Sequence, residues 1–401
     1  MKRVLALCTL YPNPANPRVG TFGARSMESL AARGDWRVNV INPIGLPPMG
    51  LGAFSDRYRA RKDVPEESRE NGVTVHRPRF TILPKVGARR NASAIAAAAL
   101  PVAKRLRQNA PIDLIDAQFF FPDGPAAATL AAELNLPFTI KARGSDITYW
   151  AKRDYARQQM RAAAQRASGL LAVSAALARE TACALDVPGD TLRVHYTGLD
   201  RDRFRPLGHT QVRAQLGETL DFSIPNDAPL LASVGALVER KGHDIAIEAL
   251  ARLKREHPEA RLLVVGKGDE EAALRRLAAE RGLQSHVHFT GSVDHDLLPV
   301  LLSAADVMVL PTSNEGLANA WVEALACGTP VVTCDVGGAR ELVTRDLAGR
   351  LVERNADAVA AAVRGVLAQP CDPQDVAALA ERFDWTTHAS ELADYYDGLP
   401  S

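Results

Sequence analysis

The feature that most constrains the fold is an alternation between short apolar runs and longer stretches rich in alanine, arginine and glutamate. The apolar runs consist mainly of valine, isoleucine and leucine, and they do not alternate with polar residues. Runs of this kind, separated by helical stretches, are typical of a parallel sheet that helices cover on both faces. The alternation runs through the chain twice, so we expect an α/β fold with two doubly wound, parallel-sheet, Rossmann-like domains.

The expected elements have the following positions. In the first half, strands are expected at 4–10, 38–41, 73–76, 114–117, 138–141, 170–173 and 192–195. In the second half, strands are expected at 230–234, 262–265, 287–290, 307–310 and 331–333. The main helices are expected at 25–33, 93–108, 126–133, 154–167, 243–256, 270–281 and 320–326. A charged stretch with glycine and proline at 197–226 separates the halves, which places the first domain at 1–200 and the second at 201–383.

The composition narrows the class of protein. A chain of 401 residues, 47% hydrophobic and 24% charged, is long enough for two domains and is not typical of disorder. Its net charge of +1 argues against a nucleic-acid partner. Five cysteines without a Cys-x-x-Cys pair are typical of a reducing compartment, so a cytoplasmic location is expected. Residues 4–10 are expected to form a strand and not a signal peptide, and no apolar run reaches the roughly 20 residues of a membrane-spanning helix.

The densest chemical signal is the stretch from Pro311 to Asn319, which follows a buried strand and leads into a helix. The first N–H groups of a helix lack internal partners, so this turn is a candidate diphosphate site. Glu315 is expected to face the hydroxyls of a sugar, and Glu323, two turns further along, is expected to reach a ribose. The alternatives are that Glu315 is an acidic residue favoured by the helix dipole and that Glu323 is solvated.

Two cations, Arg240 and Lys241, follow a strand and precede a helix. At that position they are expected to neutralise a leaving diphosphate, which is the main electrostatic demand of sugar transfer from a nucleotide. The alternative is a basic pair on the surface.

These motifs together resemble the family 4 retaining glycosyltransferases of the GT-B fold. The hallmark of that family is two glutamates separated by seven residues, as in Glu315 and Glu323. The resemblance covers nearly the whole chain and implies two facing Rossmann-like domains, with a last helix at 384–401 that crosses back onto the first domain. The residues that it assigns to the donor nucleotide sugar are Gly20, Arg240, Lys241, Val293, Gly316, Leu317, Ala318, Asn319 and Glu323.

The activity that the resemblance implies is transfer of a sugar from an NDP-sugar to a hydroxyl of a polysaccharide or lipid-linked glycan, with retention. No cofactor and no metal are expected, because enzymes of this fold do not need the Asp-x-Asp motif that occurs at 200–202. The alternatives are an NDP-sugar 2-epimerase of the same fold and a non-catalytic sugar-nucleotide-binding protein. An NAD-dependent oxidoreductase is disfavoured, because the glycine fingerprint after 262–265 is incomplete.

In the first domain, Arg143 and Asp146 follow a buried strand within the sequence Arg-Gly-Ser-Asp. Many family members have a histidine where Arg143 stands, so a guanidinium that grips a phosphate or carboxylate is expected here instead. Teichuronic-acid and exopolysaccharide sugar transferases, which this sequence looks like, tend to share the Arg-Gly-x-Asp pattern. Asp146 is expected either to act on the acceptor or to cap a helix.

Basic residues gather in the first domain. Arg153, Arg157 and Arg161 recur every four residues, which puts them on one face of a helix, and the irregular stretch at 57–90 has ten Lys and Arg against four Asp and Glu. This pattern predicts either a solvated helix face or a surface that rests on an anionic membrane at its inner face, where a lipid-linked acceptor is found.

Overall fold

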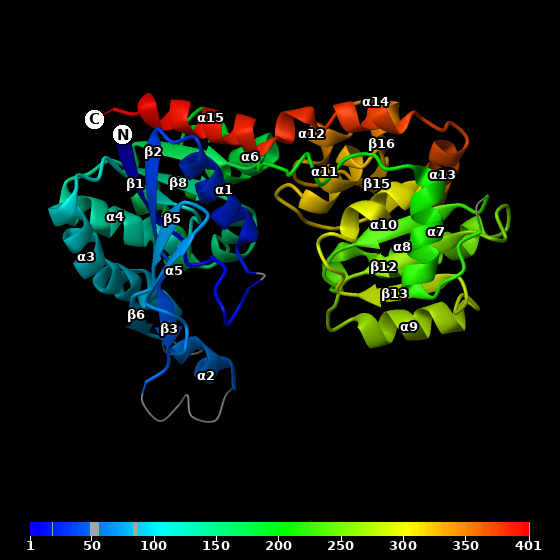
Figure 1. Cartoon of the computed structure of the whole chain (residues 1–401), viewed down its shortest axis with the longest axis horizontal. Coiled ribbons are helices and arrows are strands. Elements are labelled where there is room, and N and C mark those ends of the chain that lie inside the picture. Colours follow the sequence, from blue (N-terminus) through cyan, green and yellow to red (C-terminus); the bar gives the residue numbers. More distant parts are fainter. Residues whose placement is uncertain (18, 49–55, 83–86, 226, 401) are drawn as a thin grey trace. The chain divides into compact units, whose positions relative to one another are not determined.

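The computed structural model of the chain describes residues 1–17, 19–48, 56–82, 87–225 and 227–400 (Figure 1). It divides into two compact units. Unit 1 comprises Met1–Gly198 and Trp385–Ser401, and unit 2 comprises Leu199–Asp384. Each unit has a mostly or wholly parallel sheet, helices and an apolar core of its own, so the expected α/β architecture is confirmed.

Unit 1 is built on an eight-stranded sheet in which only β4 runs antiparallel to its neighbour. From edge to edge the strands are β10 (Leu192–Val194), β9 (Gly169–Ala172), β8 (Phe138–Ala142), β7 (Leu114–Ala117), β1 (Lys2–Leu7), β2 (Trp36–Ile41), β5 (Val73–His76) and β4 (Glu67–Glu70). The chain passes outward from β1 to β2 and later places β7 on the other side of β1. The carboxyl ends of β1 and β7 therefore form the topological switch point, where sheets of this kind bind ligands.

The helices of unit 1 connect these strands. They are α1 (Thr21–Ala32), α2 (Asp56–Lys62), α3 (Asn91–Asn109), α4 (Asp123–Leu134), α5 (Asp154–Ala164), α6 (Ala175–Leu185) and α15 (Trp385–Asp397), with short turns η1 (Ala88–Arg90) and η2 (Asp146–Trp150). The irregular stretch at 44–90 forms the small sheet of β3 (Ile44–Leu46) and β6 (Arg79–Thr81), as well as α2, β4 and β5. Parts of that stretch, at 49–55 and 83–86, lie outside the described residues.

The last helix, α15, returns to unit 1 and packs against α1. Buried polar groups attach it to the sheet. Nδ1 of His388 donates to the carbonyl of Tyr196 (2.7 Å), and its Nε2 accepts from the hydroxyl of Ser26 (2.7 Å). Nε2 of His195 donates to the carbonyl of His388 (3.0 Å), and Nδ1 of His195 accepts from Nζ of Lys141 (2.9 Å). These groups satisfy one another away from water, so the returning helix is part of the core of unit 1.

Unit 2 is built on a wholly parallel six-stranded sheet. Its strands, in order across the sheet, are β13 (Val287–Gly291), β12 (Arg261–Val265), β11 (Leu230–Val234), β14 (Val307–Leu310), β15 (Val331–Cys334) and β16 (Gly349–Val352). The strand order reverses between β11 and β14, so the switch point of unit 2 lies at the carboxyl ends of these two strands.

The helices of unit 2 follow the strands in the expected alternation. They are α7 (His209–Leu220), α8 (His243–Leu253), α9 (Glu271–Glu280), α10 (Leu298–Ala304), α11 (Asn319–Ala326), α12 (Ala339–Leu342), α13 (Ala356–Leu367) and α14 (Pro373–Ala378), with short turns η3 (Glu239–Lys241), η4 (Asp346–Ala348) and η5 (Glu381–Phe383). Among the described residues of either unit, no helix is both long enough and apolar enough to cross a membrane.

Candidate functional site

Most of the expected donor-site residues lie on two loops at the switch point of unit 2. The loop after β11 carries η3, and the loop after β14 carries residues 311–318. The backbone N–H of Ser313 donates to the carbonyl of Arg240 (2.8 Å), and the hydroxyl of Thr312 donates to the same carbonyl (3.0 Å). These bonds hold the two loops side by side, so the cations of one loop lie close to the carboxylate of the other.

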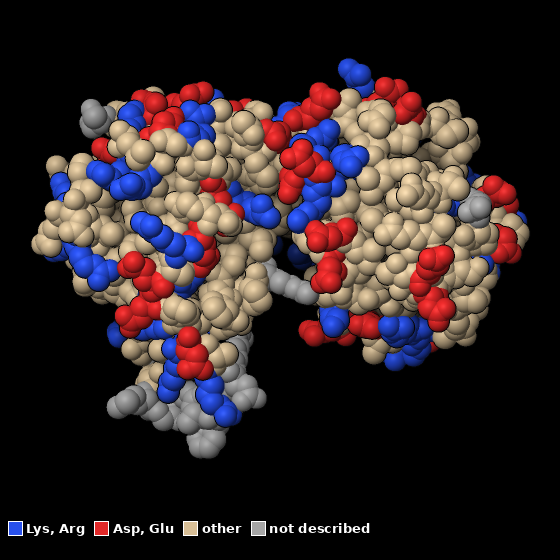
Figure 2. Space-filling view, viewed as in Figure 1, with Lys and Arg blue, Asp and Glu red and all other residues tan. Residues whose placement is uncertain are grey.

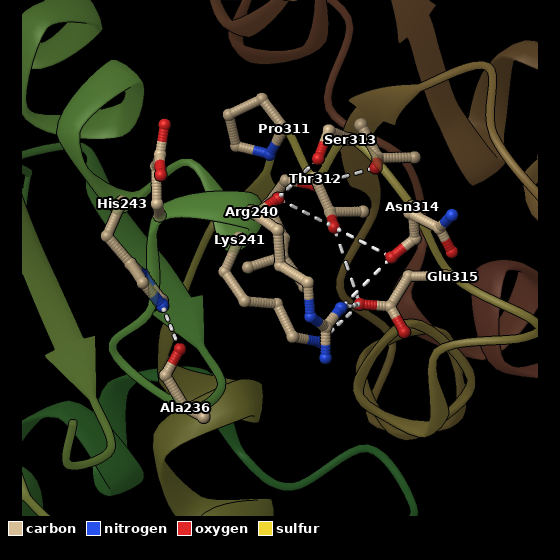
Figure 3. Close-up of polar contacts among 12 residues, drawn as sticks. Ala236, Arg240, Lys241, His243, Pro311, Thr312, Ser313, Asn314 and Glu315 are labelled. Carbon is tan, nitrogen blue, oxygen red and sulfur yellow. Dashed lines mark hydrogen bonds and ion pairs between the residues drawn. The ribbon is translucent and has the colours of Figure 1, made fainter. Parts of the chain in front are cut away.

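Glu315 and the two expected cations form one ion-paired cluster (Figure 3). Oε1 of Glu315 lies 2.5 Å from Nζ of Lys241 and 2.8 Å from Nη1 of Arg240. The side chains of Lys241 and Glu315 are only 11% and 13% exposed, so the alternative of a surface basic pair is wrong for Lys241. The sequence predicts that Glu315 faces a sugar while the cations hold a diphosphate. In the structure the three side chains bind one another.

Two glycines allow the backbone to pass close to this cluster. Gly242 has a φ of 74°, and a Cβ there would lie 2.5 Å from the carbonyl oxygen of Pro311. Gly337 has a φ of 52°, and a Cβ there would lie 1.9 Å from the carbonyl oxygen of Glu315. Both positions combine a left-handed backbone with a close backbone neighbour, so only glycine fits without moving the loop that carries Glu315.

The turn formed by Gly316, Leu317 and Ala318 leads into α11 (Asn319–Ala326), which begins one residue before the expected range of 320–326. No side chain caps this end of the helix. The first N–H groups of a helix have no intrahelical acceptor, and the helix dipole favours an anion beside them. The expected phosphate-binding character of this turn therefore fits its geometry, and the turn directly follows the glutamate of the ion-paired cluster.

The remaining expected donor-site residues of unit 2 are Glu323 and Val293. Glu323 lies within α11 and is buried, with only 6% of its surface exposed, so the alternative of a solvated glutamate is wrong. Burial raises the pKa of its carboxyl group to about 7. Val293 is half-buried in the turn between β13 and α10, two strands from the switch point.

His243, at the start of α8, supports the same site and was not expected from the sequence. Its Nε2 donates to the carbonyl of Ala236 (3.2 Å; Figure 3), and its Nδ1 accepts from the hydroxyl of Ser233 (2.8 Å). Burial lowers the pKa of this imidazole to about 4, so it is neutral at pH 7. The neutral ring fixes the turn after β11, which leads to Lys241. A single histidine after a glycine gives no sequence signal for this bond.

At the switch point of unit 1, Thr9, which lies two residues after the end of β1, binds Asp123, the first residue of α4. Thr9 donates through its hydroxyl (2.5 Å) and its N–H (3.1 Å) to the two oxygens of Asp123. Asp123 is fully buried, and burial raises the pKa of its carboxyl group to about 7. The expected Gly20 precedes α1 with a φ of 76°, and a Cβ there would lie 2.1 Å from the carbonyl oxygen of Leu10. Thr9 and Asp123 were not expected from the sequence, although Pro-Asp-Gly at the start of a helical run is a recognisable N-terminal signal.

Arg143 lies half-buried after β8, next to this switch point. Its Nε donates to the carbonyl of Gln118 (2.7 Å), and its Nη2 donates to the side-chain oxygen of the same residue. Nη1 makes no hydrogen bond to any described residue, so it remains available to an anion. The guanidinium is thus held in place by the loop after β7.

Asp146 fixes the shape of this loop. Its buried carboxylate accepts the backbone N–H groups of Phe120 (3.0 Å), Arg143 (3.1 Å), Gly144 (2.7 Å) and Ile147 (3.2 Å). A carboxylate engaged by four N–H groups and hidden from solvent does not reach an acceptor. We therefore assign Asp146 to holding the loop that presents Arg143, in place of the expected contact with the acceptor.

The basic helix face formed by Arg153, Arg157 and Arg161 is partly neutralised by neighbouring residues. Arg153 precedes α5 and stacks on the ring of Tyr149 (3.6 Å), which is 51% exposed. The two other arginines form the pairs Arg157–Asp154 (2.6 Å) and Arg161–Asp186 (2.5 Å). Figure 2 shows cations and anions interspersed over the face in view. The net positive charge of this basic helix face, which would attract an anionic membrane, is therefore smaller than the sequence indicates.

No three histidine, cysteine, aspartate or glutamate side chains of the described residues are arranged to hold a metal ion. In the Asp-x-Asp sequence, Oδ1 of Asp200 accepts the N–H of Arg203 (3.1 Å), and the carbonyl of Asp200 accepts the N–H of Phe204 (2.8 Å). Asp200 thus closes a turn at the beginning of unit 2.

Comparison with known families gives two matches that together cover most of the chain. The family described as Glycosyltransferase Family 4 matches residues 28–203, within unit 1 apart from its last few residues. The family described as Glycosyl transferases group 1 matches residues 220–388, nearly all within unit 2.

Individual proteins show the same similarity. The putative teichuronic acid biosynthesis glycosyltransferase TuaC of Bacillus subtilis is 29% identical over 365 residues, which is 90% of this chain and 88% of TuaC. A GDP-mannose-dependent phosphatidylinositol monomannoside mannosyltransferase of Mycolicibacterium smegmatis is 34% identical over 217 residues, half of this chain and about half (55%) of that protein. Among solved structures, Anabaena HepE in complex with UDP covers 100% of both chains with a TM-score of 0.74 at 20% identity.

Proposed function

We propose that this chain, a family 4-like glycosyltransferase of the GT-B fold, transfers a sugar from a nucleoside-diphosphate sugar to a hydroxyl group of a polysaccharide or lipid-linked glycan, with retention at the donor carbon. The observation that carries the proposal is the cluster of Arg240, Lys241 and Glu315 at the switch point of unit 2. The similarity to TuaC and to a GDP-mannose-dependent enzyme supports a sugar nucleotide as donor and a cell-envelope glycan as acceptor. The similarity in fold to HepE, which was solved with UDP, supports the same donor class.

The chemistry assigned to unit 2 is stabilisation of the leaving diphosphate. During transfer, the bond between the sugar carbon and the diphosphate oxygen breaks, and the electron pair stays on the diphosphate. Lys241 and Arg240 supply positive charge where this negative charge develops, and the uncapped start of α11 supplies N–H groups. Because these groups are fixed by the two joined loops, little reorganisation is needed when the bond breaks.

Glu315 has two successive functions in this proposal. Before the donor binds, its carboxylate neutralises two cations that lie 2.5 and 2.8 Å away. When the diphosphate takes these cations, the carboxylate is released and accepts hydrogen bonds from the sugar hydroxyls. The substitution E315Q keeps the size of this side chain and removes the charge that the first function needs.

Unit 1 is assigned to the acceptor. Arg143 supplies the free Nη1 group for a phosphate or carboxylate of the acceptor, and Asp146 holds its loop. Gly20 allows the close backbone turn before α1 that the family resemblance places beside the donor phosphate. We propose that the reaction needs no metal ion or other cofactor. We also propose a cytoplasmic location, because all five cysteines are unpaired.

The donor test uses the purified protein and the UDP-, GDP- and ADP-forms of common sugars. Thermal shift identifies the nucleotide, and mass spectrometry then follows the sugar with and without an undecaprenyl-diphosphate-linked saccharide as acceptor. The expected result is a glycosylated acceptor and free nucleoside diphosphate. An isomeric sugar nucleotide formed from donor alone has the mass of the donor and is separated by chromatography before detection; its formation would identify an epimerase. Binding without any product would identify a non-catalytic protein.

Association with the inner face of a membrane is a separate proposal that rests on Arg153 and the exposed ring of Tyr149. Aromatic and basic residues of this kind favour the interface of an anionic bilayer. Flotation with anionic vesicles compares the wild type with a variant in which Arg153, Arg157 and Arg161 are all replaced by glutamate. Reduced flotation of the variant is expected, and equal flotation of the two proteins refutes the proposal.

A further inference from the structure

The sheet of unit 1 carries a second polar groove, distinct from its switch point. The groove has a volume of about 720 Å³, and the last turn of α3 forms one wall of it. Three arginines line it: Arg3 of β1, Arg37 of β2 and Arg69 of β4. Arg3 and Arg37 are each the second residue of their strand, so the groove lies at the amino ends of β1 and β2, whereas the switch point lies at the carboxyl ends. A six-residue strand separates these ends by roughly 15–20 Å.

The strand register brings like charges together in this groove. Arg3 and Arg37 are directly opposite each other on the paired strands β1 and β2. Their neighbours Val4 and Val38 belong to the apolar core, so the two arginines share the other face of the sheet. Like charges that are directly opposite across two strands destabilise a sheet. This pair therefore costs folding free energy unless an anion lies beside it.

One carboxylate lies close to this pair, because Oδ2 of Asp113 accepts the backbone N–H of Arg3 (2.7 Å). No hydrogen bond or ion pair joins the guanidinium group of Arg3, Arg37 or Arg69 to another described residue. The carboxylate in the lining, that of Glu70, already accepts hydrogen bonds from Arg77 (2.7 Å) and from a serine hydroxyl. The groove thus combines three unpartnered cations with neutral hydrogen-bonding groups. These groups are the side chains of Asn39, Asn71, Thr74 and Asn109.

We propose that this groove binds an anionic saccharide. Guanidinium groups bind phosphate and carboxylate with paired hydrogen bonds, so the three arginines would hold the acidic groups. The asparagine and threonine side chains would bind the sugar hydroxyls. The volume lies within the range of roughly 300–1,000 Å³ that small-molecule sites occupy. The proposal does not depend on the donor site or on sugar transfer.

A membrane surface fits the groove less well than a saccharide does. The groove is concave, whereas a bilayer presents a broad surface to a protruding one. The large apolar side chains that are exposed among the described residues are Met1, Leu10, Val19 and Tyr149, and none of them lines the groove. An anchor that inserts into lipid is therefore missing from its lining.

The test measures binding of three probes to the full chain by saturation-transfer NMR. Hyaluronan tetrasaccharide carries two carboxylates, glucose 1,6-bisphosphate carries two phosphates, and chitotetraose is neutral. The variants are the double variant R37S/R69S, the charge-matched control R179S on the exposed face of α6, and K241M, which disables the donor site. We expect at least tenfold weaker binding of the two acidic probes in R37S/R69S and unchanged binding in R179S and K241M. Wild-type binding should weaken several-fold between about 50 and about 300 mM NaCl, because exposed charges are screened.

The outcomes that overturn the proposal are distinct. Equal binding in R37S/R69S and R179S, or no binding of either acidic probe to the wild type at low salt, refutes the groove as an anion site. Loss of binding to anionic phosphatidylglycerol vesicles in R37S/R69S, with tetrasaccharide binding retained, assigns the arginines to a membrane instead. Thermal unfolding gives an independent measurement. The single variant R37S should unfold at the same or a higher temperature than the wild type, because the like-charge pair is removed, and a clear drop in Tm shows that Arg37 is needed for the fold.

Discussion

Replacing Glu315 with glutamine is expected to tighten the binding of a nucleoside diphosphate while abolishing sugar transfer. The carboxylate holds Lys241 at 2.5 Å and Arg240 at 2.8 Å. A diphosphate that binds these cations must first separate them from Glu315, and it then lies beside a group of its own sign. Glutamine keeps the shape and removes both obstacles, but it lacks the charge to bind the sugar hydroxyls tightly.

The size of the effect follows from the distances and the exposure. Two unit charges 4 Å apart interact by about 4 kcal/mol at the effective dielectric constant of about 20 that suits protein sites. The contribution from Arg240 is small, because its side chain is 50% exposed and water screens the pair. The contribution from Lys241 is larger, since that side chain is 11% exposed. Part of it is offset by the hydrogen bonds that glutamine retains. A net gain of about 1–2 kcal/mol, or about five- to thirtyfold in Kd, is therefore expected.

Isothermal titration calorimetry of UDP and GDP checks this expectation with the wild type, E315Q and the control E280Q. Glu280 is 57% exposed at the end of α9 and lies 4.0 Å from Arg276, so its charge is lost without any change at the donor site. The expected order is tighter binding to E315Q and wild-type affinity for E280Q. Weaker binding to E315Q than to the wild type refutes the competition between Glu315 and the diphosphate.

Three further predictions concern other parts of the two sites. The substitution G337A is expected to weaken diphosphate binding more than tenfold in the same calorimetric titration, because the added Cβ would lie 1.9 Å from the carbonyl oxygen of Glu315. The control is G365A, whose added Cβ would have no neighbouring atom within 4 Å, and it should bind the diphosphate normally. The substitution D146N is expected to lower the free energy of unfolding, measured in urea, by about 3 kcal/mol, because an amide cannot accept hydrogen bonds from all four N–H groups that the carboxylate binds. A loss below about 1 kcal/mol contradicts this expectation. The raised pKa of Glu323, about 7, means that the folded state binds this proton more tightly than the unfolded state, so stability is highest at low pH and falls as pH rises from about 4.5 to about 7. Relative to the wild type, E323Q should therefore gain up to about 3 kcal/mol in urea unfolding between pH 5 and pH 8, and a constant difference would refute the raised pKa.

Most parallel strands of the two large sheets could be predicted from the sequence because they are apolar runs. The parallel strand β16 (Gly349–Val352) could not, because only two of its four residues are apolar. The strand β4 could not, because its sequence Glu67–Glu70 is entirely polar. It forms through antiparallel pairing with β5, and polar contacts of its side chains support that pairing: Glu67 lies 3.0 Å from Nδ1 of His76, and Glu70 accepts a hydrogen bond from Arg77 (2.7 Å). The strands β3 and β6 were not predicted either, because each has only three residues, too few to show a pattern.

Arg240, Lys241 and Glu315 could be proposed for a donor site from the sequence because they follow apolar strands and precede helices, and the family resemblance added the other residues. Their mutual contacts could not be predicted. Arg240 and Glu315 are 75 residues apart in the chain, and only the strand order brings their loops together. His243 and Asp123 were missed for a related reason, because a buried hydrogen bond to a distant backbone or side chain leaves no periodic pattern. Asp146 was identified with two alternatives, action on the acceptor or capping of a helix, and the sequence gives no sign that its carboxylate is buried and accepts four backbone N–H groups.

The most direct test of sugar transfer at this cluster is a count of products in one reaction mixture. The purified chain is incubated with its preferred NDP-sugar and a lipid-linked saccharide, and mass spectrometry quantifies both nucleoside diphosphate and glycosylated acceptor for the wild type, K241M and E280Q. We predict one nucleoside diphosphate for each sugar transferred by the wild type and by E280Q, with a loss of at least about a hundredfold in rate for K241M, the range found when a donor that stabilises developing charge is removed. Transfer by K241M at the wild-type rate, or release of nucleoside diphosphate without a glycosylated acceptor, would contradict the assignment of this cluster to sugar transfer.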